Sequence, residues 1–151
     1  MTSPQPQRAF VGVHLLMIQD NCLFLTKRLV KNSMYGMYAL VAGKVDQFES
    51  PRDALVREAR EEIGVILTPE SLDHVTTVHH AQSDYKLEKH DVIEFYFLAK
   101  EWQGTPVNHE PDKIHEIGFF PMDALPTPLP RGLTHALEAL KTGQRFIELR
   151  P

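Results

Sequence analysis

The segment from residue 50 to residue 64 carries signals for both ends of a helix, and the rest of the fold must be built around that helix. Ser50 suits an N-cap, Pro51 suits the first helical position, and Asp53 stands where a capping box places its acid. Gly64 supplies a stop signal. The sequence therefore predicts a helix over residues 51–63.

Apolar runs rich in β-branched and aromatic residues precede this helix and predict strands. Residues 9–20 and 22–29 are predicted to form a hairpin around an Asp20-Asn21 turn. Residues 38–44 are predicted to be a short strand that leads the chain into the acidic segment before the helix.

The second half of the chain repeats the strand pattern and then changes to a helical one. Strands are predicted over residues 75–82, 91–102 and 114–122. Beyond a proline-rich stretch, residues 133–143 place three leucines and an alanine on one helical stripe that ends at Gly143. This order of elements predicts an α/β (α+β) fold with a mixed sheet and at least two helices.

The length of 151 residues suits one domain, which we expect over residues 9–151, after a flexible polar arm at residues 1–8. A net charge of −4 gives no broad basic surface for a nucleic acid polymer or an anionic membrane. Cys22 is the single cysteine, and no apolar run is long enough to span a bilayer. These features predict a soluble, cytoplasmic protein.

Three like charges are crowded on the predicted helix. Glu58, Glu61 and Glu62 fall within an arc of about 100°, so their carboxylates can converge. Like charges at this spacing each cost a few tenths of a kcal/mol, and acids near a helix C-terminus oppose its dipole. Arg57 can offset part of this repulsion, so a solvated acidic face is one interpretation and a metal site is the other.

The wider spacing distinguishes these interpretations. Gly43, five residues, Glu49, seven residues and then residues 57–65 resemble the Nudix box at each of its fixed positions, with Ala59 where a bulkier aliphatic is more usual. The stretches "LFLTKR", "WQGTPVNHE" and "FFPMDALP" extend a resemblance to MutT-like Nudix hydrolases over residues 9–140. The resemblance implies an α/β/α sandwich around a central mixed sheet, in which the box forms a loop, a helix and a second loop.

The chemistry of such enzymes explains the crowded acids. A phosphoanhydride reacts slowly with water until divalent cations neutralise its oxygens and orient the nucleophile. Mg²⁺ takes a few carboxylate oxygens and shares its coordination with substrate phosphates. The resemblance implies Mg²⁺, with Mn²⁺ as a substitute, and the implied metal ligands are Gly43 (through its carbonyl), Glu58, Glu61 and Glu62.

The same resemblance implies roles for further residues. Glu49 and Arg57 are expected to form an ion pair that anchors the loop, with direct metal binding by Glu49 as the alternative. Glu110 is expected to act as a metal ligand or as the base for the attacking water. The predicted catalytic set is Glu58, Glu61, Glu62, Glu110, Arg57 and Glu49.

The candidates outside the box, which include other acids and the residues expected to bind substrate, are supported by weaker sequence signals. Glu88, Glu94 and Glu116 are rivals of Glu110, and the strand neighbours of Glu94 suggest a structural place in the sheet. Lys44 and Arg28 are expected to contact substrate phosphate. The aromatic candidates for stacking a nucleobase are Trp102, Tyr35 and Phe95, none of which stands out.

The expected function is Mg²⁺-dependent hydrolysis of a small nucleoside di- or triphosphate derivative by water attack. The alternatives are hydrolysis of a nucleotide-sugar or a dinucleoside polyphosphate, and a non-catalytic nucleotide sensor. The expected partner is a small-molecule nucleotide, and a homodimer is possible on family grounds. The segment "PTPLPRG" lacks the asparagine that similar enzymes for oxidised guanine nucleotides tend to place there, which argues against that specificity.

Overall fold

The computed structural model describes residues 3–29, 34–83 and 90–151, so Glu88 lies outside the described residues. The chain forms two helices, a short 3₁₀ helix and nine strands within the described residues. In order they are β1 (Ala9–Leu16), β2 (Ile18–Gln19), β3 (Cys22–Arg28), β4 (Tyr38–Ala39), β5 (Val41–Lys44), α1 (Pro51–Ile63), η1 (Pro69–Ser71), β6 (Leu72–Ser83), β7 (His90–Ala99), β8 (Ile114–Pro121), α2 (Arg131–Thr142) and β9 (Phe146–Leu149).

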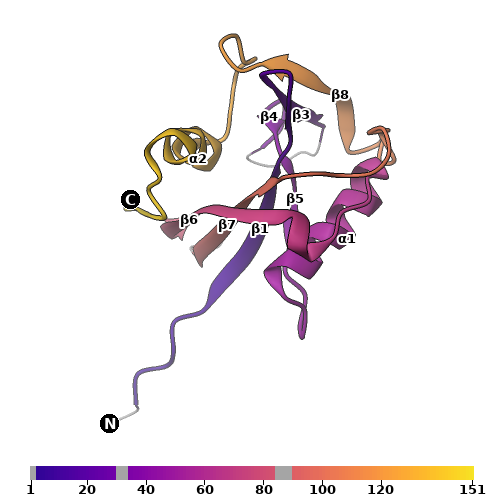
Figure 1. Ribbon diagram of the computed structural model, residues 1–151. Coiled ribbons are helices and arrows are strands. Elements are labelled where there is room, and N and C mark those ends of the chain that lie inside the picture. Colours follow the sequence, from indigo (N-terminus) through magenta and orange to yellow (C-terminus); the bar gives the residue numbers. More distant parts are fainter. Residues whose placement is uncertain (1–2, 30–33, 84–89) are drawn as a thin grey trace.

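The strands form two sheets. The first has the order β5-β1-β7-β6-β9, and the second joins β2, β3 and β4, with β8 also paired to β3. β1 runs parallel to β7 and β6 parallel to β9, whereas the other pairs of the first sheet are antiparallel. The helices lie on opposite sides of this mixed sheet (Figure 1). The predicted α/β/α arrangement is therefore confirmed.

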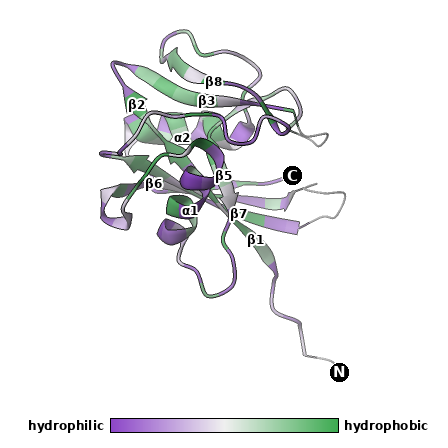
Figure 2. Cartoon of the chain, turned by 90° about the vertical axis from the view of Figure 1, so that its right-hand side faces the viewer, coloured by the Kyte–Doolittle hydropathy of each residue, from purple (hydrophilic) through white to green (hydrophobic). Residues whose placement is uncertain are grey.

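Each helix closes a separate hydrophobic core, because successive side chains of a strand point to opposite faces. Helix α1 buries Leu55, Ala59 and Ile63 in one core with residues such as Val13 and Phe97. Helix α2 buries its own apolar stripe in the other core, which contains Val78, Tyr96, Leu133, Ala136 and Ala139. Figure 2 shows hydrophobic residues along β3 and β8, while α1 carries residues of both kinds.

The signals at the helix ends predicted the structure well. The Ser50 hydroxyl accepts a hydrogen bond from the Asp53 amide at 3.1 Å, and α1 starts at Pro51. Gly64 ends the helix in the left-handed region, with φ of 70°. Helix α2 begins at Arg131, two residues before the predicted start, and β9 was not predicted. Among the described residues, no helix has the length and apolar character needed to cross a bilayer.

The predicted hairpin was wrong over its first half. The chain breaks at the fully buried Met17, so that β1 joins the first sheet and only β2 pairs with β3 across the Asp20-Asn21 turn. The stretch 38–44 breaks in the same way at Leu40, since β4 pairs with β3 and β5 pairs with β1. In each stretch the apolar run continues through the break, over residues 15–18 and 38–42, and the hydropathy pattern therefore does not reveal the change of sheet.

Candidate active site

Arg57 attaches helix α1 to the loop that follows β5. Its guanidinium donates hydrogen bonds of 2.8 and 3.0 Å to the two oxygens of Glu49 and one of 3.1 Å to the Lys44 carbonyl. The hydrogen bond from Arg57 holds the pKa of Glu49 below its ordinary value. The planar guanidinium suits this two-point contact. The structure thus contains the ion pair that the sequence predicts.

The same guanidinium also lies between two acids of the helix. Arg57 Nη1 donates to Glu58 Oε1 at 2.9 Å and is 3.5 Å from Glu61 Oε2. The Glu61 side chain is 54% exposed. In this arrangement the described residues hold no group of three or more acidic, histidine or cysteine side chains placed to bind one metal ion. The three helix glutamates are neighbours, but their carboxylates do not converge here.

Glu62 lies in a different environment from the other two. Its side chain is only 5% exposed, and Oε2 is buried without a hydrogen-bond partner. Arg28 Nη1 is 3.7 Å from Glu62 Oε1, which is too far for a hydrogen bond. Burial raises the pKa of Glu62 to about 8, against the opposing charge of Arg28. An unpartnered carboxylate oxygen in the interior is costly and calls for a cation.

Gly43 on β5 packs directly against Glu58. A Cβ added at Gly43 would overlap the Glu58 carboxyl group, so this position accepts no larger residue without a shift of Glu58. Burial raises the pKa of Glu58, and the hydrogen bond from Arg57 opposes that increase. The lack of a side chain at Gly43 therefore lets the backbone approach the acidic face of α1.

The loop that carries Glu110 is tied to the end of helix α1. The His109 amide donates to the Glu62 carbonyl at 3.0 Å, and Glu110 Oε1 lies 3.3 Å from Lys113 Nζ. The Glu110 charge helps to raise the pKa of both Glu62 and Glu58. Its rival Glu116 is exposed on β8, where one carboxylate oxygen lies 3.5 Å from the Tyr38 hydroxyl. The structure favours Glu110 over Glu116 for a place beside the helix acids.

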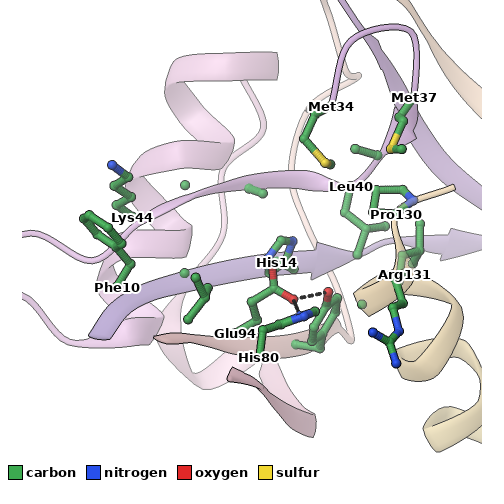
Figure 3. A pocket seen from close by; sticks show the side chains of 18 of the residues that line it. Phe10, His14, Met34, Met37, Leu40, Lys44, His80, Glu94, Pro130 and Arg131 are labelled. Atoms are coloured by element: carbon green, nitrogen blue, oxygen red, sulfur yellow. Dashed lines mark hydrogen bonds and ion pairs between the residues drawn. The ribbon is translucent and has the colours of Figure 1, made fainter. Parts of the chain in front are cut away.

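A pocket of about 410 Å³ extends from the glycine of the box to the start of helix α2 (Figure 3). Lys44 and Arg28, the two residues predicted to contact substrate phosphate, both line it, and Lys44 Nζ lies 4.7 Å from the centre of the Phe10 ring. The other lining residues with polar or aromatic side chains are Phe10, His14, His80, Glu94, Tyr96 and Arg131.

The donor set at the box fits a hard divalent cation. Carboxylates and a backbone carbonyl are the oxygen ligands that Mg²⁺ takes in proteins. The buried Glu62 Oε2 has no partner, and Glu58 lies next to it on the helix with a raised pKa. Binding of a cation would satisfy that oxygen and offset the repulsion among the three carboxylates.

A family model described as the NUDIX domain matches residues 6–140 of the chain. The chain belongs to the Nudix family. Two 8-oxo-dGTP diphosphatases are similar to it. That of Proteus vulgaris is 31% identical over 97 residues, covering 64% of this chain and 80% of the relative. That of Escherichia coli (strain K12) is 25% identical over 100 residues, covering 66% of this chain and 72% of the relative.

A similar solved structure is the MutT NUDIX hydrolase from Burkholderia pseudomallei, with a TM-score of 0.79 and 30% identity over 89% of this chain and 99% of that one. The match to the family and these relatives identify this Nudix protein as a hydrolase of phosphoanhydride bonds.

The structure brings most of the predicted residues together around the second half of helix α1. Glu61 lies at the exposed edge of this group. Trp102 and Phe95 pack in the α1 core, and Tyr35 is exposed, so none of the three lines the pocket. Sequence reasoning missed the pocket residues His14, His80 and Tyr96, and it considered Glu94 only as a rival of Glu110 with a structural place in the sheet. The sequence did contain a signal for Glu94. Val92, Glu94 and Tyr96 alternate along β7, so all three side chains lie on the same face of the strand, and all three line the pocket.

Proposed function

We propose that this Nudix protein is a Mg²⁺-dependent pyrophosphohydrolase that cleaves the phosphoanhydride bond of a small nucleoside di- or triphosphate derivative by attack of water. The buried, unpartnered oxygen of Glu62 carries this proposal, because it lies beside other acids near a pocket of nucleotide size. Without a bound metal ion, burial of this carboxylate costs stability that the charge of Arg28 offsets only in part.

The ion would be held by Glu58, Glu61, Glu62 and the Gly43 carbonyl, and Mn²⁺ could replace Mg²⁺. When bound, it neutralises charge on the phosphate oxygens and makes bound water more acidic. Glu58 and Glu61 would have to turn from Arg57 toward Glu62 for this, and the Glu61 contact is the longer and more exposed of the two.

The residues around the acids have distinct roles in this proposal. Glu110 accepts the proton of the attacking water, and its loop connection to Glu62 keeps it near the helix acids. Arg57 and Glu49 position the box loop rather than touch the reacting atoms. Lys44 and Arg28 bind the substrate phosphates, since both line the pocket, Lys44 follows Gly43 directly and Arg28 Nη1 lies 3.7 Å from Glu62 Oε1.

The residues of the proposed site support cleavage of a phosphoanhydride bond, and they do not distinguish between the groups attached to it. A nucleotide-sugar or a dinucleoside polyphosphate has the same linkage and is the alternative substrate class, and a sensor without catalysis is a further alternative. The two relatives named above are 8-oxo-dGTP diphosphatases. We do not assign that substrate to this chain, because "PTPLPRG" offers no asparagine amide at the start of α2.

The composition supports a cytoplasmic setting for the proposed enzyme. A single cysteine and a negative net charge suit a cytoplasmic enzyme of small molecules rather than a binder of nucleic acid polymers or membranes. Light scattering would distinguish a monomer from the homodimer that the family resemblance allows.

The test is a hydrolysis screen over nucleoside triphosphates, nucleotide-sugars and dinucleoside polyphosphates, with Mg²⁺ or Mn²⁺ and with products identified by mass. Glu62→Gln should lower kcat/KM by at least about 100-fold, the scale of losing one key electrostatic contact in a transition state. Glu116→Gln, which alters an exposed acid on β8, is the matched control and should keep wild-type activity. Wild-type turnover by Glu62→Gln would refute the proposal, and binding without turnover across the screen would favour a sensor.

A further inference from the structure

Glu94 lies in the floor of the pocket with polar groups from three strands directed at it (Figure 3). His14 Nε2 on β1 is 3.2 Å from Oε1, and His80 Nε2 on β6 is 2.8 Å from Oε2. The Tyr96 hydroxyl on β7 donates to Oε2 at 2.9 Å. The His14 ring also stacks on Tyr96, with centroids 4.5 Å apart and planes 12° apart. The carboxylate is therefore held in one position.

The surroundings of Glu94 favour the ionised form. Burial by itself would raise the pKa of Glu94, but the neighbouring imidazoles of His14 and His80 outweigh it and hold the pKa below the ordinary range. Gly132, in the first turn of α2, leaves the space that this arrangement needs. A Cβ at Gly132 would collide with the Tyr96 hydroxyl and with Glu94 Oε2.

The neighbours do not use all of the accepting capacity of this carboxylate. An ionised carboxylate offers about four lone-pair positions on its two oxygens. When both imidazoles donate, Oε2 receives two hydrogen bonds, from His80 and Tyr96, and Oε1 receives one, from His14. One accepting position therefore remains on Oε1 for a donor that enters the pocket.

The rest of the pocket suits a flat heterocycle joined to phosphates. Gly43 and Lys44 form the end that lies at the proposed phosphate site, and apolar side chains such as Met37, Leu40 and Leu133 line the walls. A substrate whose phosphates lie at the box glutamates would thus extend its base toward Glu94. Ligand pockets commonly have this form, with apolar walls and a few fixed polar groups that set specificity.

We propose that Glu94 is a specificity-determining residue that accepts a hydrogen bond from the exocyclic amino group of the nucleobase, so that the pocket selects amino-bearing bases over their counterparts without that group. The inference rests on the proposed function. A keto oxygen in the same place would set two acceptors against each other, and a missing amino group would leave the buried acceptor unpaired.

The test compares kcat/KM within matched pairs of nucleoside triphosphates, namely CTP with UTP, ATP with ITP, and GTP with ITP. The wild-type protein should favour the amino-bearing member of at least one pair by roughly 10- to 100-fold, as expected for a hydrogen bond to a charged group. Glu94→Gln should reduce that ratio to less than about 3-fold or invert it, because the Gln amide can also donate to a keto oxygen.

Asp91→Asn is a matched control on the same two strands. His79 Nε2 lies 2.8 Å from Asp91 Oδ2, the same distance as in the His80–Glu94 pair, and the two carboxylate side chains are 16% and 19% exposed. Asp91 does not line the pocket, since its side chain points to the opposite face of β7. Asp91→Asn should therefore keep the wild-type ratio within each pair.

The ratio is the decisive measurement because a partly unfolded preparation lowers both members of a pair equally. Wild-type ratios all within about 3-fold, or an unchanged ratio in Glu94→Gln, would overturn the role of Glu94 while leaving the proposed function intact. An equal loss of discrimination in Asp91→Asn would show a general effect of sheet distortion and would also overturn it. If no nucleotide of the panel is hydrolysed, the proposed function itself fails.

Discussion

At the scale of single residues, Glu62 shows a conflict between stability and chemistry. The chain buries a carboxylate without a hydrogen-bond partner for one of its oxygens, and burial raises its pKa to about 8. The unfolded chain would ionise the same group near its ordinary value of 4.5. Between these two pH values the metal-free folded state binds a proton that the unfolded state releases.

The sign of the pH dependence follows from this difference. The free energy of unfolding of the metal-free protein should fall by a few kcal/mol as pH rises from about 4.5 to about 8, because the buried group must then lose its proton. In Glu62→Gln this component should be absent, and the variant should be the more stable protein at pH 8. Denaturant unfolding in a chelator at pH 5 to 9 measures both. Parallel curves for the two proteins would contradict the prediction.

The site residues differ in how far the sequence predicts them. Glu58 and Glu62 follow from the spacing of the box, because a local motif fixes their positions relative to Gly43. The role proposed for Glu94 does not follow from local sequence, because it depends on the contact with His14. His14 is 80 residues away in the chain, and the pairing of β1 with β7 brings it to Glu94. Long-range pairing of this kind has no local signature in a single sequence.

At the scale of elements, helix α1 and the preceding loop act as one unit because Arg57 spans both. Arg57→Lys keeps the charge but replaces the planar two-point contact with Glu49 by a single flexible ammonium. We expect kcat/KM to fall by roughly 10- to 100-fold from lost positioning, in line with small misplacements at active sites. The far-UV circular dichroism should stay unchanged.

Arg60→Lys provides the comparison, because Arg60 lies exposed on the same helix. It should keep wild-type kcat/KM. If kcat/KM fell equally in the two variants, replacing any arginine of α1 with lysine would lower activity. The specific anchoring role of Arg57 would then be wrong.

The elements also differ in how well local signals define them. The limits of α1 follow from Ser50, Pro51 and Gly64, since capping groups act within one turn. Strand β9 was missed because its four residues gain their pairing only from β6, which precedes it by more than sixty residues. The broken hairpin was missed because the same apolar pattern suits either sheet.

At the scale of the whole molecule, a cation that binds only the folded site should stabilise the entire domain. A ligand at 100 times its dissociation constant contributes about 2.7 kcal/mol, which corresponds to a rise in Tm of several degrees for a chain of this size. Mg²⁺ should therefore raise the Tm of the wild-type protein and of Glu116→Gln, but not that of Glu62→Gln. Differential scanning calorimetry measures this. A rise of the same size in Glu62→Gln would place the ion elsewhere.

The breaks at Met17 and Leu40 have a consequence for how this molecule opens. At each break one continuous stretch of backbone leaves one sheet and enters the other, so the sheets are joined by two nearby covalent crossings. Peeling the sheets apart would strain both crossings and would pull directly on Gly43 and Lys44. Amide protons of β3 and β7 should therefore exchange with deuterium in a single concerted event. No long-lived intermediate should keep the loop between β5 and α1 intact after one of the two sheets has separated.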